Sequence, residues 1–150
     1  MKSPIETTAI QRAAGFTLVE LIVAMVIAAI LAAIAIPAYS SYVLQAHRTD
    51  AKTALLDLAS LEERYFSVNN AYTLVATNLG YSAFPQTVGG GYYQVTVSSV
   101  TPPGTGTLAA YTLQATAIGN QTKDTLCTTF TLDSTGVQTS SDTTNNSCWH

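Results

Sequence analysis

The chain has 150 residues, enough for one domain beside a membrane segment, and its formal net charge is −3. Charged residues make up 10% of it, compared with about 25% in an average soluble protein. The low charge and the acidic balance exclude the general basic surface that attracts nucleic acid, and they fit a membrane segment followed by a neutral extracellular surface.

The chain begins with a short polar segment, residues 1–15, and continues with a long apolar run. No polar side chain occurs from Leu21 to Ile36, and a helix from Phe16 to Ile36 would be about 30 Å long, the thickness of a bilayer's hydrocarbon core. Basic residues before such a run hold that end in the cytoplasm, as Lys2 and Arg12 would here. The sequence therefore predicts a membrane-spanning helix with a cytoplasmic N-terminus.

The residues Gly15-Phe16-Thr17-Leu18-Val19-Glu20-Leu21, followed by an apolar helix that reaches Pro37, resemble the type III leader and N-terminus of type IV pilins and pseudopilins. The resemblance implies cleavage between Gly15 and Phe16 by a prepilin peptidase and N-methylation of the new Phe16 amine. It also implies that residues 1–15 are a removed leader, 16–37 the membrane and filament-core helix, and 38–150 the head outside the membrane.

Glu20 is the one charged residue near the start of the apolar segment. A carboxylate at the centre of a membrane helix costs about 2.5 to 3.5 kcal/mol, and less near an end, so Glu20 needs a partner. The resemblance implies a filament, in which the Phe16 ammonium of a neighbouring subunit would pair with Glu20 and fix the register of assembly. The alternative is a plain single-span anchor whose Glu20 reaches the membrane interface.

Beyond Pro37, which removes one hydrogen bond and usually kinks a helix, the pattern becomes amphipathic. Apolar residues recur at steps of three and four, which predicts one helix from about Phe16 to Val68 whose second half packs one face on a sheet. His47 is interpreted as a solvated surface residue. The predicted apolar face comprises Tyr39, Tyr42, Val43, Ala46, Ala51, Ala54, Leu55, Leu58, Leu61 and Tyr65, and the opposite face Gln45, Arg48, Asp50, Lys52, Asp57, Glu62, Glu63 and Arg64.

The second half of the chain predicts an antiparallel sheet. Residues 69–91 are too apolar for a free linker and should lie on the head. Alternating residues then predict strands around 93–98 and 111–117, a third strand with Leu126, Phe130 and Leu132 on one side, and a short strand near Val137. Three or four strands with one apolar face need the amphipathic helix as cover, which gives an α+β pilin fold.

Cys127, placed in the third strand, and Cys148 are the two cysteines, and outside the cytoplasm such a pair is typical of a disulfide. The bridge would close a loop of about 20 residues and contribute roughly 3 kcal/mol. Type IV pilins commonly have such a C-terminal region, here 127–148. The stretches 62–73, 126–136 and 148–149 most resemble the PilE-type minor pilins of the type IVa system. Two free thiols are the alternative.

No catalytic motif with credible spacing occurs, so the sequence predicts no enzyme, no cofactor and no metal site. A calcium site in the C-terminal loops is the alternative, although no dense run of Asp and Asn ligands is visible there. The resemblance implies a structural subunit, a minor pilin that takes part in pilus assembly or priming, with roles in twitching motility, adhesion or DNA uptake. Its implied partners are major and minor pilins, the prepilin peptidase and the inner-membrane assembly machinery. It would sit in the inner membrane before assembly and in the extracellular pilus afterwards.

Three other functions stay open at this point. A major pilin shares the architecture, and a pseudopilin of type II secretion shares the leader. The third alternative is a pilin that captures DNA or a host ligand directly. Loss of Lys2, Glu6 and Arg12 with the leader changes the net charge from −3 to −4, so direct DNA binding is not expected.

Overall fold

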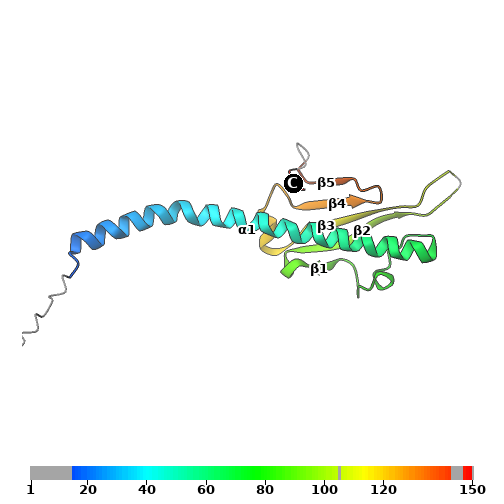
Figure 1. Ribbon diagram of the computed structural model, residues 1–150, viewed down its shortest axis with the longest axis horizontal. Coiled ribbons are helices and arrows are strands. Elements are labelled where there is room, and N and C mark those ends of the chain that lie inside the picture. The colour runs from blue at the N-terminus through cyan, green and yellow to red at the C-terminus, as the bar shows by residue number, and fades with distance from the viewer. Residues whose placement is uncertain (1–14, 105, 143–146, 150) are drawn as a thin grey trace, which may run out of the picture. The chain divides into compact units, whose positions relative to one another are not determined.

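The computed structural model describes residues 15–104, 106–142 and 147–149 (Figure 1). In these ranges the chain forms one α-helix, three short 3-10 helices and five β-strands. The chain divides into two compact units between Ala38 and Tyr39. The leader other than Gly15, with its basic residues Lys2 and Arg12, lies outside the described residues.

The α-helix α1 runs from Leu18 to Asn69 with Pro37 inside it, which confirms the prediction of one long helix. It begins at Leu18 because Thr17 caps it: Oγ1 of Thr17 accepts a hydrogen bond of 3.2 Å from the Glu20 backbone N–H. Threonine three residues before glutamate is the sequence signature of a capping box. The helix ends before Asn70, which has a left-handed φ of 53°. The kink at Pro37 stays a prediction.

The first unit consists of the apolar part of α1. Every side chain from Phe16 to Ile36 is exposed in the isolated chain. The helix is long and apolar enough to cross a membrane. A run of exposed Leu, Ile and Val of this length is stable only when lipid or other protein covers it.

The second unit contains a five-stranded antiparallel sheet in the order β1-β2-β3-β4-β5, so that each strand pairs with its neighbour in sequence (Figure 1). The sheet has more strands than the three or four expected. The additional strand is β1, which lies in the segment predicted to be a connection; with three residues it is too short to show alternation. The strands are β1 (Gln86–Val88), β2 (Tyr93–Thr101), β3 (Ala110–Ala117), β4 (Thr129–Asp133) and β5 (Gln138–Ser140).

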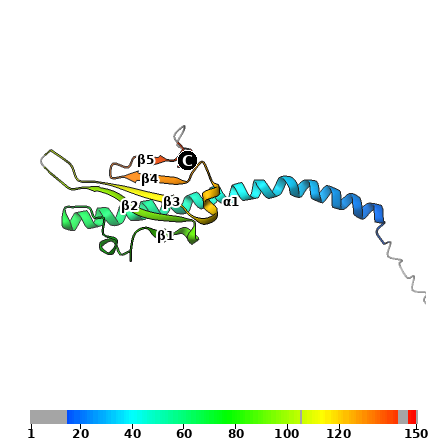
Figure 2. The ribbon, with the colours of Figure 1, turned by 180° about the vertical axis from the view of Figure 1, so that it is seen from behind.

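The core lies between the second half of α1 and one face of the sheet; Figure 2 shows the sheet from the other side. The alternation predicted for β2 and β3 is confirmed, because every second side chain is buried from Tyr93 to Val97 and along β3. The connection between α1 and β2 also lies on the head, and Leu79 of its first 3-10 helix (Ala76–Leu79) is buried. The inward side chains are Tyr93, Val95 and Val97 on β2, Tyr111, Leu113, Ala115 and Ala117 on β3, and Phe130 and Leu132 on β4.

The prediction for the start of the third strand was wrong. Leu126 is 63% exposed rather than part of the apolar face, and Cys127 lies before β4 instead of within it. The cause is a turn: the backbone N–H of Cys127 donates to the carbonyl of Asp124 at 3.1 Å, so the chain becomes extended only at Thr129.

Cys127 and Cys148 form a disulfide with their Cα atoms 5.6 Å apart, and both are buried. We expect the variant Cys127→Ala/Cys148→Ala to lose about 3 kcal/mol of unfolding free energy, because the unfolded chain is no longer closed into a loop of about 20 residues. Urea denaturation of both proteins measures the difference. The parent protein under reducing conditions serves as the control and should resemble the variant; an unchanged midpoint would contradict the prediction.

Candidate assembly segment and head surface

The residues that the sequence predicts to act in processing and assembly lie together at the start of the apolar unit. Phe16 is 83% exposed and precedes the helix, so the Gly15–Phe16 bond is outside helical structure. Phe16 and Glu20 line the same shallow apolar hollow on the surface of α1, together with Leu21 and Ala24. An exposed carboxylate thus sits at the edge of a surface that otherwise offers only hydrocarbon.

Thr17 is a residue of this segment whose role was not predicted. Its hydroxyl fixes the first turn of α1 by accepting from the Glu20 N–H. Helix α1 therefore begins after Gly15 and Phe16, and these two residues lie outside it. The spacing of Thr17 and Glu20 was a visible signal, since a capping box can be read from sequence.

A polar network joins α1 to the 3-10 helix that follows β3 (Gly119–Lys123), and its centre is the buried Gln121. The Nε2 of Gln121 donates to the Leu44 carbonyl at 2.9 Å and to the Tyr93 hydroxyl at 3.0 Å. Its Oε1 lies 3.1 Å from Nδ1 of His47, and because an amide oxygen only accepts, Nδ1 carries the proton. Burial raises the pKa of Tyr93 to about 12, so its hydroxyl stays neutral.

Two further contacts strengthen this junction and correct the predicted helix face. The Arg48 guanidinium donates to both carboxylate oxygens of Asp124, at 2.7 and 2.9 Å, and this pairing raises the pKa of Arg48. The His47 ring stacks on Tyr92 with ring centroids 3.5 Å apart. Arg48 and His47 were expected on the solvated side, but the 3-10 helix after β3 covers them, and the helix pattern alone does not reveal that cover.

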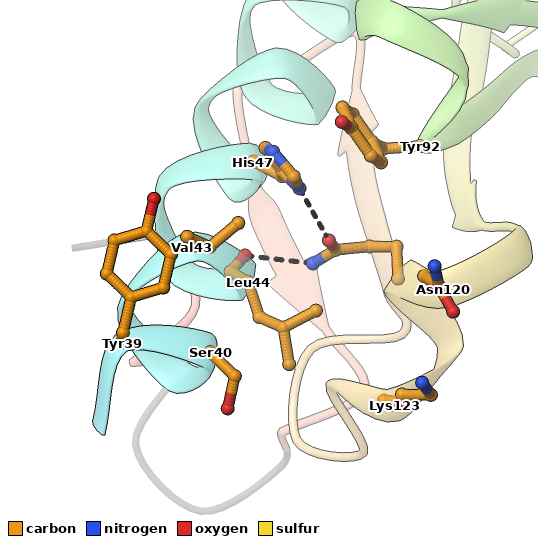
Figure 3. A pocket seen from close by; sticks show the side chains of 9 residues that line it. Tyr39, Ser40, Val43, Leu44, His47, Tyr92, Asn120 and Lys123 are labelled. Carbon is orange, nitrogen blue, oxygen red and sulfur yellow. Dashed lines mark hydrogen bonds between the residues drawn. The ribbon is translucent and has the colours of Figure 1, made fainter. Parts of the chain in front are cut away.

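A hollow of about 540 Å³ opens beside this network (Figure 3). Five residues of α1 between Tyr39 and His47 line one side of it. Tyr92 and three residues of the 3-10 helix after β3, Asn120, Gln121 and Lys123, line the other. The hollow thus has an apolar floor and a polar rim, as ligand sites commonly do.

At the other end of the head, Glu62 is a buried acid. It was expected on the solvated face of α1 but is 0% exposed, because the chain after the helix folds over it. Its Oε2 accepts from the Thr73 backbone N–H at 3.1 Å, and its Oε1 has no hydrogen-bond partner among the described residues. Glu63 beside it accepts from the Tyr72 hydroxyl at 3.0 Å. The two acids therefore hold the start of the connecting segment.

The burial of Glu62 predicts a pH-dependent stability. Burial raises its pKa above the ordinary 4.5, the Thr73 N–H opposes the shift, and the charge of Glu63 adds to it. The folded chain therefore holds this proton to a higher pH than the unfolded chain does. The contribution is fully present below pH 4.5 and is lost as the pH rises through the folded pKa.

We expect Glu62→Gln to reduce this decline in unfolding free energy as the pH rises from about 4 to 7, since an amide does not ionise. Urea denaturation at several pH values measures the slope. Asp57→Asn, which removes an exposed acid from the same helix, should keep the parent's slope. Equal slopes for the parent and Glu62→Gln would contradict the expectation.

The head offers few cations. Arg48 is held by Asp124, and the remaining basic residues after Pro37 are Lys52, Arg64 and Lys123. Within the described part of the chain no group of three or more His, Cys, Asp or Glu side chains is placed to hold a metal ion. The described head therefore offers neither a basic patch nor a group of metal ligands.

A long helix packed on an antiparallel sheet, with its apolar first half exposed, defines a pilin-like α+β protein. Two sequence families match: "Type IV minor pilin ComP, DNA uptake sequence receptor" over residues 37–131 and "Prokaryotic N-terminal methylation motif" over residues 10–36. One relative, the "Type IV major pilin protein PilA" of Myxococcus xanthus (strain DK1622), is 37% identical over 68 residues. That match spans 45% of this chain and 31% of the relative's length.

The chain belongs to the type IV pilin family, because these matches agree with the fold and with the N-terminal motif. Type IV pilins are structural proteins; they are processed by a prepilin peptidase and assemble with other pilins. The apolar first half of α1 and the methylation motif fit a pilin that is anchored in the membrane first and is part of a pilus later.

Proposed function

We propose that this chain is a minor subunit of a type IV pilus that takes part in filament assembly or priming. The observation that carries the proposal is the match of residues 37–131, most of the head, to a minor-pilin family. The match to a major pilin is shorter and covers 31% of that protein. The exposed apolar helix supports a role in assembly, because it needs lipid before assembly and other helices afterwards.

In this proposal the prepilin peptidase cuts between Gly15 and Phe16, and the new amine of Phe16 is methylated. This bond lies before the start of α1 and its two residues are exposed, which supports access by the peptidase. Residues 16–37 then anchor the precursor in the inner membrane with the N-terminus in the cytoplasm, and the head, residues 38–150, lies outside. During assembly Glu20 pairs with the Phe16 amine of a neighbouring subunit, and the disulfide region 127–148 lies in the extracellular head.

Mass spectrometry of sheared, purified filaments tests the proposal. We expect a peptide that begins at methylated Phe16 and an abundance of a few per cent of the dominant pilin or less. A dominant amount would make the chain a major pilin. Processed protein in membranes but not in filaments would indicate a pseudopilin or an assembly factor instead.

A second candidate function, direct DNA capture in uptake, is favoured by the description of the matching family as a DNA uptake sequence receptor. The described head argues against a general electrostatic mechanism, since Arg48 is engaged by Asp124 and the processed chain has a net charge of −4. Fluorescence anisotropy of labelled duplex DNA with the detergent-solubilised processed chain distinguishes DNA capture from the assembly role. Binding that weakens steeply with salt would favour capture by phosphate contacts, and no binding at low salt would leave the assembly role.

A further inference from the structure

The hollow between α1 and the 3-10 helix after β3 has no role in the proposed function (Figure 3). Val43 and Leu44 supply an apolar floor, and the side chains of Ser40, Asn120 and Lys123 lie at its edge. Figure 3 shows the α1 residues on one side, with Asn120 and Lys123 on the other. A ligand that suits this lining has an anionic polar group attached to a hydrocarbon part.

The charge of the hollow is set by Lys123. The acid next to it in sequence, Asp124, is already engaged by both hydrogen bonds from Arg48. Lys123 forms no salt bridge within the described ranges. The carboxylate that would otherwise neutralise this ammonium is thus occupied, which leaves Lys123 available to a phosphate.

The hollow begins directly after the apolar run. Tyr39 and Ser40 follow Ile36 on the same continuous helix, so at about 1.5 Å per residue they lie no more than about 6 Å along the chain from the last residue of that run. The head-group layer on each side of a bilayer is about 5 to 8 Å thick. Tyr39 and Tyr42 are 72% and 71% exposed. Exposed tyrosines directly after an apolar run are typical of the membrane interface.

We propose that this hollow binds the head group of an anionic phospholipid while the chain is in the membrane. The phosphate lies against Lys123 and the Asn120 amide, and the first carbons of an acyl chain lie on Val43 and Leu44. The inference rests on the membrane anchorage in the proposed function. A lipid held at this point seats the head on the bilayer and is released when the subunit leaves the membrane.

Native mass spectrometry of the processed full-length chain tests this, with the chain released from nanodiscs that contain equal amounts of phosphatidylglycerol and phosphatidylcholine. We expect a one-to-one phosphatidylglycerol adduct. Lys123→Gln should lower the fraction of chain that carries it about fivefold, the effect of one cation near an anionic membrane surface. Arg64→Gln, which removes a cation from α1 away from the hollow, should leave the adduct unchanged.

Hydrogen exchange provides the second measurement. Amides of residues 39–47 and 119–124 should exchange more slowly in nanodiscs with phosphatidylglycerol than in phosphatidylcholine alone, and less so in Lys123→Gln. The inference would be overturned if phosphatidylglycerol and phosphatidylcholine gave equal adducts, or if Arg64→Gln lost the adduct as much as Lys123→Gln does. A dimer of the chain in place of a lipid adduct would also overturn it. Resistance of the chain to carbonate extraction is measured in parallel, so that a failure of membrane anchorage is distinguished from a failure of the lipid site.

Discussion

Replacing Glu20 with Ala is expected to abolish incorporation into filaments while the chain stays in the membrane. Glu20 is exposed at the edge of an apolar helix surface that a filament core would bury. In the filament core of the variant, the Phe16 amine of a neighbouring subunit would be buried without its partner. Such a loss costs about 3 to 5 kcal/mol. That cost corresponds to a loss of at least about a hundredfold in incorporation. Immunoblots of sheared filaments and of membranes measure it.

The design separates the charge from other effects of the substitution. Glu20→Gln keeps the shape and removes the charge, so it should fail in the same way as Glu20→Ala. Val26→Ala, on the same exposed apolar helix but outside the hollow that Phe16 and Glu20 line, should be incorporated. The mass of the membrane form shows whether cleavage after Gly15 still occurs, because an unprocessed chain would fail for another reason. Normal incorporation of processed Glu20→Ala would refute the pairing.

The elements with a repeated pattern could be predicted from the sequence. The helix was expected from Phe16 to Val68 and runs from Leu18 to Asn69, because period and length are both visible over so many residues. The burial of every second residue from Tyr93 to Val97 and along β3 was predictable for the same reason. β1 was not, because three residues paired at a sheet edge carry too little pattern.

The head's polar contacts could not be predicted, because they join residues far apart in the chain. Arg48 and Asp124 each resemble ordinary surface charges, and only the docking of the 3-10 helix after β3 on α1 brings them together. Glu62 lies between solvated residues of one helix face, yet the segment that reaches Thr73 buries it. Helical periodicity assigns a face to water or to core, but it does not show which loop will cover part of that face.

The largest loss of stability is expected for Phe130→Ala. Phe130 is fully buried on β4, with its ring 5.8 Å from that of Tyr93 and 5.7 Å from that of Trp149, both nearly perpendicular. Its partner in register on β3 is Ala115, which is too small to fill the space that the ring would leave. A void of this kind costs about 3 to 5 kcal/mol, a large part of the total stability of a domain.

Urea denaturation measures this loss, and two variants bracket it. Thr129→Ala, at a half-buried position on the same strand, should change the unfolding free energy by less than about 0.5 kcal/mol. Phe130→Leu fills most of the space and should lose less than about 1.5 kcal/mol. A loss for Phe130→Ala no larger than that for Thr129→Ala would show that β4 is not held by this ring.

Trp149 reports the same substitution in the folded state. It is the single tryptophan of the chain, and its indole N–H donates to the Thr139 carbonyl at 2.7 Å while its ring leans on Phe130. Without the Phe130 ring the indole loses its ring contact on β4, so water reaches more of it. Its fluorescence maximum in Phe130→Ala should therefore shift to longer wavelength before denaturant is added. An unshifted maximum together with a full loss of stability would place the void on the Tyr93 side of the ring.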